Sequence, residues 1–128
     1  MLYHDTWLQF KPLVEKIGKV YANEAPLYSD YLKVAGTVDC VGYWEGKRSI
    51  IDFKTSSRFK AKEDIETYWM QCSAYSVMWE ERTGQPITNL VILMSVEDDS
   101  PLCYNSHRDE WIGKFIKLRK EFKEKFGD

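Results

Sequence analysis

The stretch GTVDCVGYWEGKRSIIDFKTS, residues 36–56, decides the fold expected for this chain. Tyr31–Trp44 is rich in Val, Tyr and Thr, and Ser49–Phe53 has a similar composition, so both segments predict β-strands. Between them, Glu45-Gly46 suits the two-residue turn of a hairpin, in which positive φ angles favour glycine. The stretch therefore predicts a β-hairpin.

The turn fixes which side chains of the hairpin face each other. With Trp44 paired to Lys47, directly opposed residues have numbers that add up to 91. Asp39 then lies opposite Asp52, and two carboxylates in that position repel each other. A divalent cation between them turns this repulsion into binding, and oxygen ligands suit Mg²⁺. The register thus predicts a metal site, although scattered surface charges on an exposed hairpin face are the alternative interpretation.

Lys54 completes the set of charged side chains on this face. It lies two residues after Asp52, opposite Thr37, and side chains alternate along a strand, so it points into the same site. A lysine beside a metal-bound phosphodiester orients or deprotonates the attacking water, or neutralises the charge that develops on the phosphate. The role as a base depends on the pKa of the lysine, which the sequence does not give.

Two helices and a buried strand are expected around the hairpin. Apolar residues recur at helical spacing over Thr6–Tyr21 and over Asp64–Thr83, and Gly84 ends the second helix. Asn89–Val96 (NLVILMSV) is almost continuously apolar, which is typical of a central strand buried on both faces.

A last helix is expected to begin at Asn105 or Ser106, with Trp111, Phe115 and Phe122 on its apolar side. The order of helix, hairpin, helix, strand and helix predicts an α/β sandwich with a small mixed sheet. The length of 128 residues predicts a single domain over 1–128.

Composition limits the classes of function. The net charge of −2 is not that of a strongly basic nucleic-acid-binding protein, although a local cationic surface and an acidic metal site cancel in such a total. Cys40, Cys72 and Cys103 are odd in number and widely spaced, which argues against a disulfide framework and against zinc or iron–sulfur ligation. Buried free thiols in a reducing compartment are expected, and no membrane span, signal peptide or transit segment is seen. We therefore expect a protein of the cytoplasm, or a viral protein acting in the host cytoplasm.

Three ordered motifs connect the hairpin to the second helix. Gly36–Asp39 (GTVD) is followed by Ile50–Ser56 (IIDFKTS) and by Gln71–Tyr75 (QCSAY). This order resembles the RecB-like branch of the PD-(D/E)XK nucleases, where G-x-x-D precedes a hydrophobic run ending in D-x-K-T and then Q-x-x-x-Y. The resemblance is nearest to the mitochondrial genome maintenance exonucleases and related phage exonucleases.

The resemblance implies a restriction-endonuclease-like core, an α/β fold with a small mixed sheet and a hairpin flanked by helices. It also implies hydrolysis of DNA phosphodiesters with Mg²⁺ or Mn²⁺. The site residues that it implies are Asp39, Asp52 and the Phe53 main-chain carbonyl as metal ligands, Lys54 as the catalytic lysine, and Gln71 and Tyr75 on one helix face.

Acidic and histidine residues outside the motifs bear on how complete the site is. Glu24 is either a third metal-ligating carboxylate or a capping or surface glutamate. RecB-like enzymes usually carry a metal-binding histidine well upstream of G-x-x-D, and no corresponding segment is found here. His4 replaces it only if the start of the chain folds back onto the site, whereas His107 is expected to cap the last helix or lie on the surface.

Polar and basic residues at the end of the strand that carries Asp52 and Lys54, and just after it, are candidates for binding DNA. The candidates are Thr55, Ser56, Arg58, Lys60 and Lys62. Phe59 among them is positioned to stack on a base, and a solvated loop with Phe59 packed inward is the alternative.

The lysines of the last helix mostly predict a solvated helix face. Trp44 and Trp69 are the aromatic residues to examine for contact with DNA.

Three hypotheses follow for the function. The first is a Mg²⁺- or Mn²⁺-dependent deoxyribonuclease, an exonuclease acting on single-stranded or end-containing DNA. The second is a catalytically incomplete nuclease-fold module for DNA binding or assembly, whose site an additional chain or oligomer completes. The third, an iron–sulfur-containing relative of the CRISPR adaptation nucleases, is disfavoured by the cysteine spacing. RNA stays open as a substrate, since nothing in the sequence reads a 2′-hydroxyl.

Overall fold

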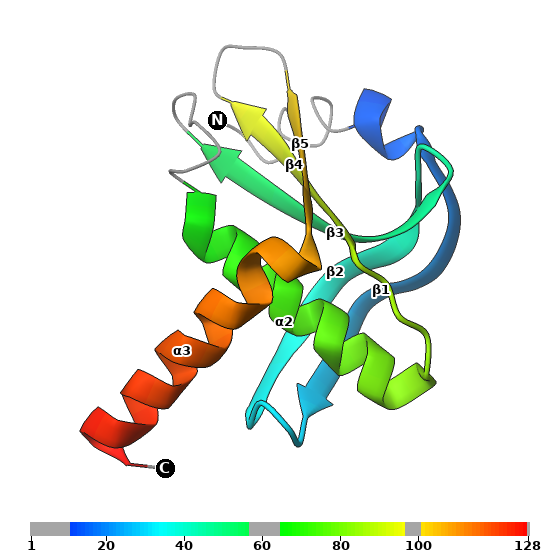
Figure 1. Cartoon of the computed structure of the whole chain (residues 1–128). Helices are drawn as coiled ribbons and strands as arrows, with labels where there is room; N and C mark the ends of the chain where they lie inside the picture. Colours follow the sequence, from blue (N-terminus) through cyan, green and yellow to red (C-terminus); the bar gives the residue numbers. More distant parts are fainter. Residues whose placement is uncertain (1–10, 57–64, 97–100, 128) are drawn as a thin grey trace.

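The computed structural model of the chain contains a five-stranded mixed sheet in the order β1-β2-β3-β4-β5 (Figure 1). The structure describes residues 11–56, 65–96 and 101–127. Within these ranges, β3 and β4 pair in parallel and the other neighbours pair antiparallel. The strands are β1 (Ile17–Ser29), β2 (Val34–Trp44), β3 (Lys47–Ser56), β4 (Asn89–Val96) and β5 (Leu102–His107).

Helices cover both faces of the sheet. On one face lies α2 (Glu66–Thr83), against which α3 (Arg108–Phe126) packs in turn (Figure 1). The indole rings of Trp69 and Trp111 stack at a centroid distance of 6.4 Å and join the two helices. On the other face, residues 11–14 are helical, and Leu13 packs with Ile51 and neighbouring apolar side chains. These layers confirm the predicted α/β class. No helix in the described part of the chain is long and apolar enough to cross a membrane.

The hairpin has the predicted turn and register. Trp44 pairs with Lys47, and the ladder continues in that register to Cys40 and Ile51. Glu45 and Gly46 have φ angles of 50° and 78°, so both central residues are left-handed, as in a type I′ turn. Glycine carries this conformation without steric strain.

The prediction of a helix over Thr6–Tyr21 is wrong in its second half. Helical residues end at residue 14, and β1 begins at Ile17. The spacing of Val14, Ile17 and Tyr21 fits a helix, but Gly18 and Val20 have poor helix propensity, and hydrogen bonds to β2 are available to the segment. Pairing with a neighbouring strand therefore overrides a local pattern.

The last helix begins later than predicted. Leu102–His107 forms the edge strand β5, and α3 starts at Arg108 rather than at Asn105 or Ser106. His107 is the N-cap, since its Nδ1 accepts a hydrogen bond from the Asp109 main-chain N–H at 3.0 Å. The capping role expected for His107 is thus confirmed.

The predicted second helix and buried strand are both present. The helix ends at Thr83, and Gly84 adopts the left-handed conformation (φ 76°) while its N–H donates to the Glu80 carbonyl. All residues of β4 from Leu90 to Val96 are buried, as expected of a strand covered on both faces.

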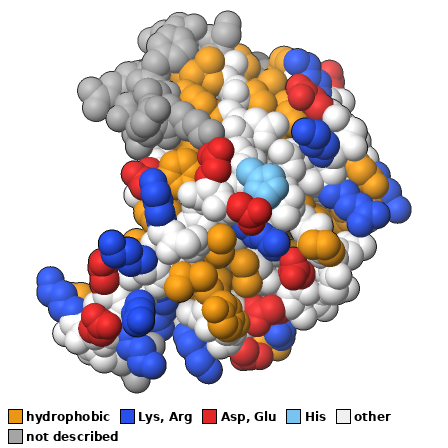
Figure 2. Space-filling model, viewed as in Figure 1, with side chains coloured by type: hydrophobic (Ala, Val, Ile, Leu, Met, Phe, Trp, Pro, Cys, Tyr) orange, Lys and Arg blue, Asp and Glu red, His pale blue; other side chains and the backbone are white. Residues whose placement is uncertain are grey.

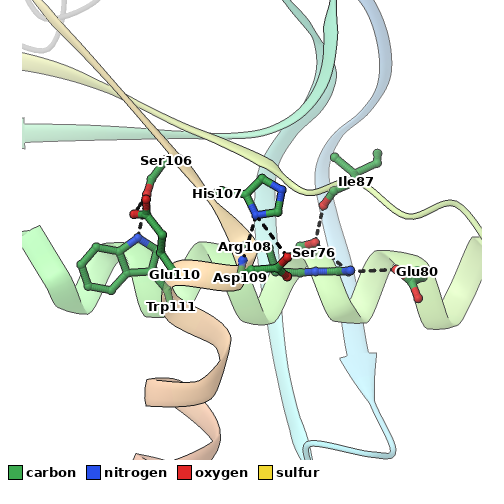
Figure 3. Close-up of polar contacts among 9 residues, drawn as sticks. All are labelled: Ser76, Glu80, Ile87, Ser106, His107, Arg108, Asp109, Glu110 and Trp111. Atoms are coloured by element: carbon green, nitrogen blue, oxygen red, sulfur yellow. Dashed lines mark hydrogen bonds and ion pairs between the residues drawn. The ribbon is translucent and has the colours of Figure 1, made fainter.

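A polar cluster ties the start of α3 to α2, and we call it the α3 junction (Figure 3). Arg108 Nη1 donates to Glu80 Oε1 at 2.8 Å and to Ser76 Oγ at 3.3 Å. The Ser76 hydroxyl in turn donates to the Ile87 carbonyl. Beside them, Trp111 Nε1 donates to Ser106 Oγ at 2.8 Å. The cluster therefore joins α2, the entry to β4 and α3 through polar groups that have partners.

Candidate active site

The candidate site begins where the pairing of β2 and β3 ends. Among the described residues, the ladder between β2 and β3 stops at Cys40–Ile51. The predicted pairs Asp39–Asp52 and Thr37–Lys54 are therefore not part of this ladder. On its other side β3 pairs with β4 along Ser49–Ser56, so from Asp52 onward β4 is its ladder partner. The Asp39 side chain bridges the separating strands, because its Oδ2 accepts a hydrogen bond from the Phe53 main-chain N–H at 2.9 Å.

Asp52 is the buried acid of the site. Only 3% of its surface is exposed. Burial, followed by hydrogen bonding and charge repulsion from Asp39, raises the pKa of Asp52 from 3.8 to about 7, against the opposing effect of the Lys54 ammonium. Within the described residues, Asp52 Oδ2 is buried and has no hydrogen bond, although Lys54 Nζ lies 3.1 Å away. The contact with Lys54 is therefore an ion pair without the geometry of a hydrogen bond, which leaves a buried carboxylate oxygen that accepts none from the part of the chain that the structure describes.

Lys54 links the acid to α2. Its Nζ lies 3.3 Å from Gln71 Oε1, and Gln71 Nε2 donates to the Tyr75 hydroxyl at 3.0 Å. The ammonium group also lies 4.7 Å from the centre of the Tyr68 ring. Burial lowers the pKa of Lys54, but the Asp52 carboxylate outweighs that effect and the pKa is raised overall. Lys54 is therefore a cation at neutral pH in the metal-free protein, which favours charge neutralisation over the role of a base.

Gly36 and Tyr75 explain the first and last positions of the motifs. A Cβ at Gly36 would lie 2.9 Å from Tyr75 Cε1, closer than such atoms approach, so glycine allows the tyrosine ring to lie against β2. Burial raises the pKa of Tyr75 to about 12, which keeps its hydroxyl protonated. The motifs thus correspond to one contiguous set of contacts between β2, β3 and α2.

A cavity of about 290 Å³ opens beside Asp39, and Asn23, Glu24 and Phe53 are its other lining residues. Glu24 lies across from Asp39 on β1, between the paired residues Asn23 and Ala25. It has a φ of 47°, which costs a non-glycine residue on the order of 1–3 kcal/mol. Such strain clusters at functional sites. Glu24 is exposed on a strand, so it is not a helix cap.

The donor set of the site fits a hard divalent cation. Asp39 and Asp52 supply carboxylate oxygens, and the Asp52 Oδ2 that accepts no hydrogen bond among the described residues is the kind of ligand that Mg²⁺ or Mn²⁺ prefers. Over the described ranges, no three His, Cys, Asp or Glu side chains converge closely enough to hold a metal ion. The two aspartates, with the Phe53 carbonyl and Glu24 nearby, would therefore hold a cation that keeps several water ligands.

The remaining candidates differ in their placement. On β3, Thr55 is exposed and Ser56 is half-buried. Trp44 and Trp69 belong to the core with exposures of 2% and 0%, which excludes contact with DNA in this conformation. Cys40 and Cys72 are buried as expected, whereas Cys103 is exposed. His4, Arg58, Phe59, Lys60 and Lys62 lie outside the described residues.

Two residues of the site were missed by sequence reasoning. Tyr68 contacts the Lys54 ammonium, and its position three residues before Gln71 places it on the same helix face. That spacing was a usable signal. Asn23 lines the cavity next to Asp39, but its strand was not predicted, so no signal indicated it.

Comparisons with known proteins support the fold. No family model matches the sequence, and no curated protein matches it. The crystal structure of a protein described as a “putative exonuclease” from Eubacterium rectale is similar, with a TM-score of 0.67 at 12% sequence identity. The match covers 95% of this chain and 50% of that one, so the chain spans about half of the length of that protein. At this identity the likeness shows a shared fold.

Proposed function

We propose that this chain is a metal-dependent deoxyribonuclease of the RecB-like PD-(D/E)XK branch, an exonuclease acting on single-stranded or end-containing DNA. The observation that carries the proposal is the buried Asp52 Oδ2, which has no hydrogen bond among the described residues and lies next to Asp39 and Lys54. A site made only for stability would leave neither a buried acceptor unsatisfied nor two carboxylates in repulsion. The fold shared with a “putative exonuclease” supports the same class of activity.

The residues of the site divide the chemical work. Asp39 and Asp52 would hold a divalent cation, which would supply polarisation of the phosphodiester and a lowered pKa for a bound water. Lys54 stays protonated and neutralises the charge that develops on the phosphate. Gln71 accepts from Lys54 and donates to Tyr75, so these two residues hold the ammonium group in position.

Cleavage assays with the purified chain test the proposal. Labelled linear single-stranded DNA, linear duplex and circular single-stranded DNA are incubated with Mg²⁺ or Mn²⁺. We expect shortening of the linear substrates and no cutting of the circle, and Asp39→Asn and Asp52→Asn are expected to abolish the shortening. Intact linear DNA in both metals would count against a nuclease, and a cut circle would make the enzyme an endonuclease.

A second candidate is a catalytically incomplete module that binds DNA or assembles with another chain. It is favoured by the lack of three converging metal-ligating side chains in the described ranges. DNA binding without cleavage, with Asp52→Ala leaving the affinity unchanged, would support this candidate. Cleavage that appears only on addition of a further chain would indicate a site completed by a partner.

A further inference from the structure

A cationic cavity lies between α3 and the turn that joins β1 to β2. Its volume is about 260 Å³. The turn is well fixed, because Lys33 N–H donates to the Ser29 carbonyl at 3.0 Å and Leu32 N–H donates to Ser29 Oγ at 2.8 Å. Arg119 of α3 donates to the Lys33 carbonyl at 3.3 Å and holds the helix against the turn. Hydrogen bonds therefore fix the backbone of the turn and its position against α3.

All charged side chains that line this cavity are positive. Its lining includes Lys33, Arg119, Lys120 and Lys123 and no acidic residue. In the described part of the chain, no ion pair neutralises Lys33, Lys120 or Lys123. Figure 2 shows Lys and Arg side chains over α3 at the lower left, with Asp and Glu side chains among them. In a chain with a net charge of −2, such a local excess of cations indicates an anionic ligand.

An exposed aromatic ring lies at this cavity. Tyr31 also lines it and is 74% exposed, the highest value among the exposed large hydrophobic residues. The Tyr31 main-chain N–H donates to Glu81 Oε1 at 3.3 Å, which helps to fix the backbone that carries the ring. Cations beside an exposed aromatic ring are the combination that binds the phosphates and bases of single strands.

A second cavity lies beside the candidate active site and, like the cationic cavity, has residues of α3 in its lining. It has a volume of about 370 Å³, and its lining includes Val34, Phe115 and Leu118. In sequence, Val34 follows Lys33 of the cationic cavity, and Phe115 and Leu118 are next to Ile116 and Arg119 of its α3 wall.

At its other end, the second cavity is lined by Tyr68, Gln71 and Tyr75, which contact Lys54 or one another in the candidate site. We call the two cavities together the groove, with its cationic end at Lys33 and α3 and its other end at the residues that contact Lys54.

We propose that this groove binds the single-stranded part of a DNA substrate, with backbone phosphates at Lys33, Arg119, Lys120 and Lys123 and a base stacked on Tyr31. The apolar middle of the groove suits unpaired bases, which a duplex keeps inside its own stack. The direction of the strand, toward Lys54, rests on the proposed nuclease function. Lys120 and Lys123 of the last helix therefore have a role beyond that of a solvated face.

Binding without cleavage tests the groove separately from the activity. Fluorescence anisotropy is measured in EDTA with labelled oligothymidylates of about 4 and about 20 nucleotides. The slope of log K against the logarithm of the salt concentration is measured for the longer strand. In the triple variant Lys33→Gln, Lys120→Gln, Lys123→Gln, we expect the magnitude of this slope to fall by about 2, because each lost phosphate contact removes about 0.7. Tyr31→Ala is expected to weaken binding by about 5- to 100-fold.

A charge-matched control separates the groove from general attraction. Lys47, Lys117 and Lys125 are exposed and do not line either cavity, so their triple substitution by Gln is expected to leave the slope within about 0.5 of wild type. An equal loss in both triple variants, or no binding of the longer strand by wild type, would overturn the proposal. A loss of binding that is specific to the groove variant supports the groove even if the wild type cleaves no DNA. If the wild type cleaves DNA but the groove variant binds the longer strand as tightly as the wild type, the groove is refuted and the proposed nuclease function is not.

Discussion

Two polar clusters lie along α2, and they differ in how completely their groups are satisfied. At the α3 junction, the Arg108 guanidinium has Glu80 at 2.8 Å and Ser76 at 3.3 Å. At the candidate site, the Asp52 carboxylate has Oδ2 without a hydrogen bond among the described residues, and its pKa is raised to about 7.

The difference separates a structural cluster from a functional one. Polar groups that all have partners rigidify a fold, whereas an unsatisfied buried carboxylate costs stability unless a ligand completes it. The α3 junction also has a fixed supply of partners from three elements, while the candidate site borders an open cavity at Asp39. Substitutions at the α3 junction are therefore expected to lower stability, and substitutions at the candidate site are expected to lower activity.

The largest expected effect is on activity at the candidate site. Lys54→Met is expected to lower the cleavage rate by about 10³-fold, because it removes the charge facing the phosphate. The matched control is Lys114→Met, since Lys114 forms an ion pair with Glu66 at 3.0 Å, close to the 3.1 Å of Lys54 and Asp52. Cleavage rates are measured on linear single-stranded DNA. An equal loss of rate in Lys114→Met would mean that the effect of Lys54→Met does not come from the position of Lys54 in the candidate site.

The next effect is on stability and depends on pH. Because the pKa of Asp52 is raised from 3.8 to about 7 in the folded protein, the unfolded chain ionises first as the pH rises. The stabilisation by the protonated acid is therefore lost between about pH 4 and pH 7. Asp52→Asn avoids this loss, so in EDTA at pH 8 it is expected to be more stable than wild type by on the order of 2 kcal/mol.

Urea unfolding of both proteins from pH 4 to pH 8 measures this difference, which is expected to shrink toward pH 4. Asp30→Asn is the control, because the Asp30 side chain is 78% exposed and its ion pair with Arg82 spans 3.6 Å. A destabilised Asp52→Asn at pH 8 would mean that the buried carboxylate is satisfied after all.

The α3 junction is expected to give the reverse result. Arg108→Met leaves Glu80 and the Ser76 hydroxyl without their guanidinium partner and is expected to cost about 1–2 kcal/mol of unfolding free energy. Cleavage by the folded variant is expected to equal that of wild type at 25 °C. Lys114→Met again serves as the control, with a loss below about 0.5 kcal/mol. Loss of activity without loss of stability would contradict the assignment of the junction as structural.

The smallest expected effect is at the cap of α3. His107→Ala removes the acceptor for the Asp109 N–H and is expected to cost about 0.5–1 kcal/mol in thermal or urea unfolding. His107→Asn restores a capping acceptor and is expected to recover most of that loss. If the asparagine variant is as unstable as the alanine variant, the imidazole contributes by packing and not by capping.

Local chemistry explains which elements were predictable. The Glu45-Gly46 turn fixed the register of the hairpin, because a two-residue turn permits few alternatives. Gly84 ended α2 and the apolar run gave β4, since both signals are contained in a few neighbouring residues. The edge strands β1 and β5 were missed, because they gain their hydrogen bonds from partners that are remote in sequence or hidden by a helical pattern.

The sequence by itself determined the hairpin, its register and the set of side chains, Asp39, Asp52 and Lys54, that gathers where it ends. Turn geometry and strand alternation act over a few residues, so they can be deduced without the rest of the chain. Only the tertiary structure decided that the ladder ends at Cys40–Ile51, that Asp52 is buried with a raised pKa, and that two cavities are lined by residues of α3. Burial, desolvation and cavities depend on how separate elements pack, and no local pattern specifies that packing.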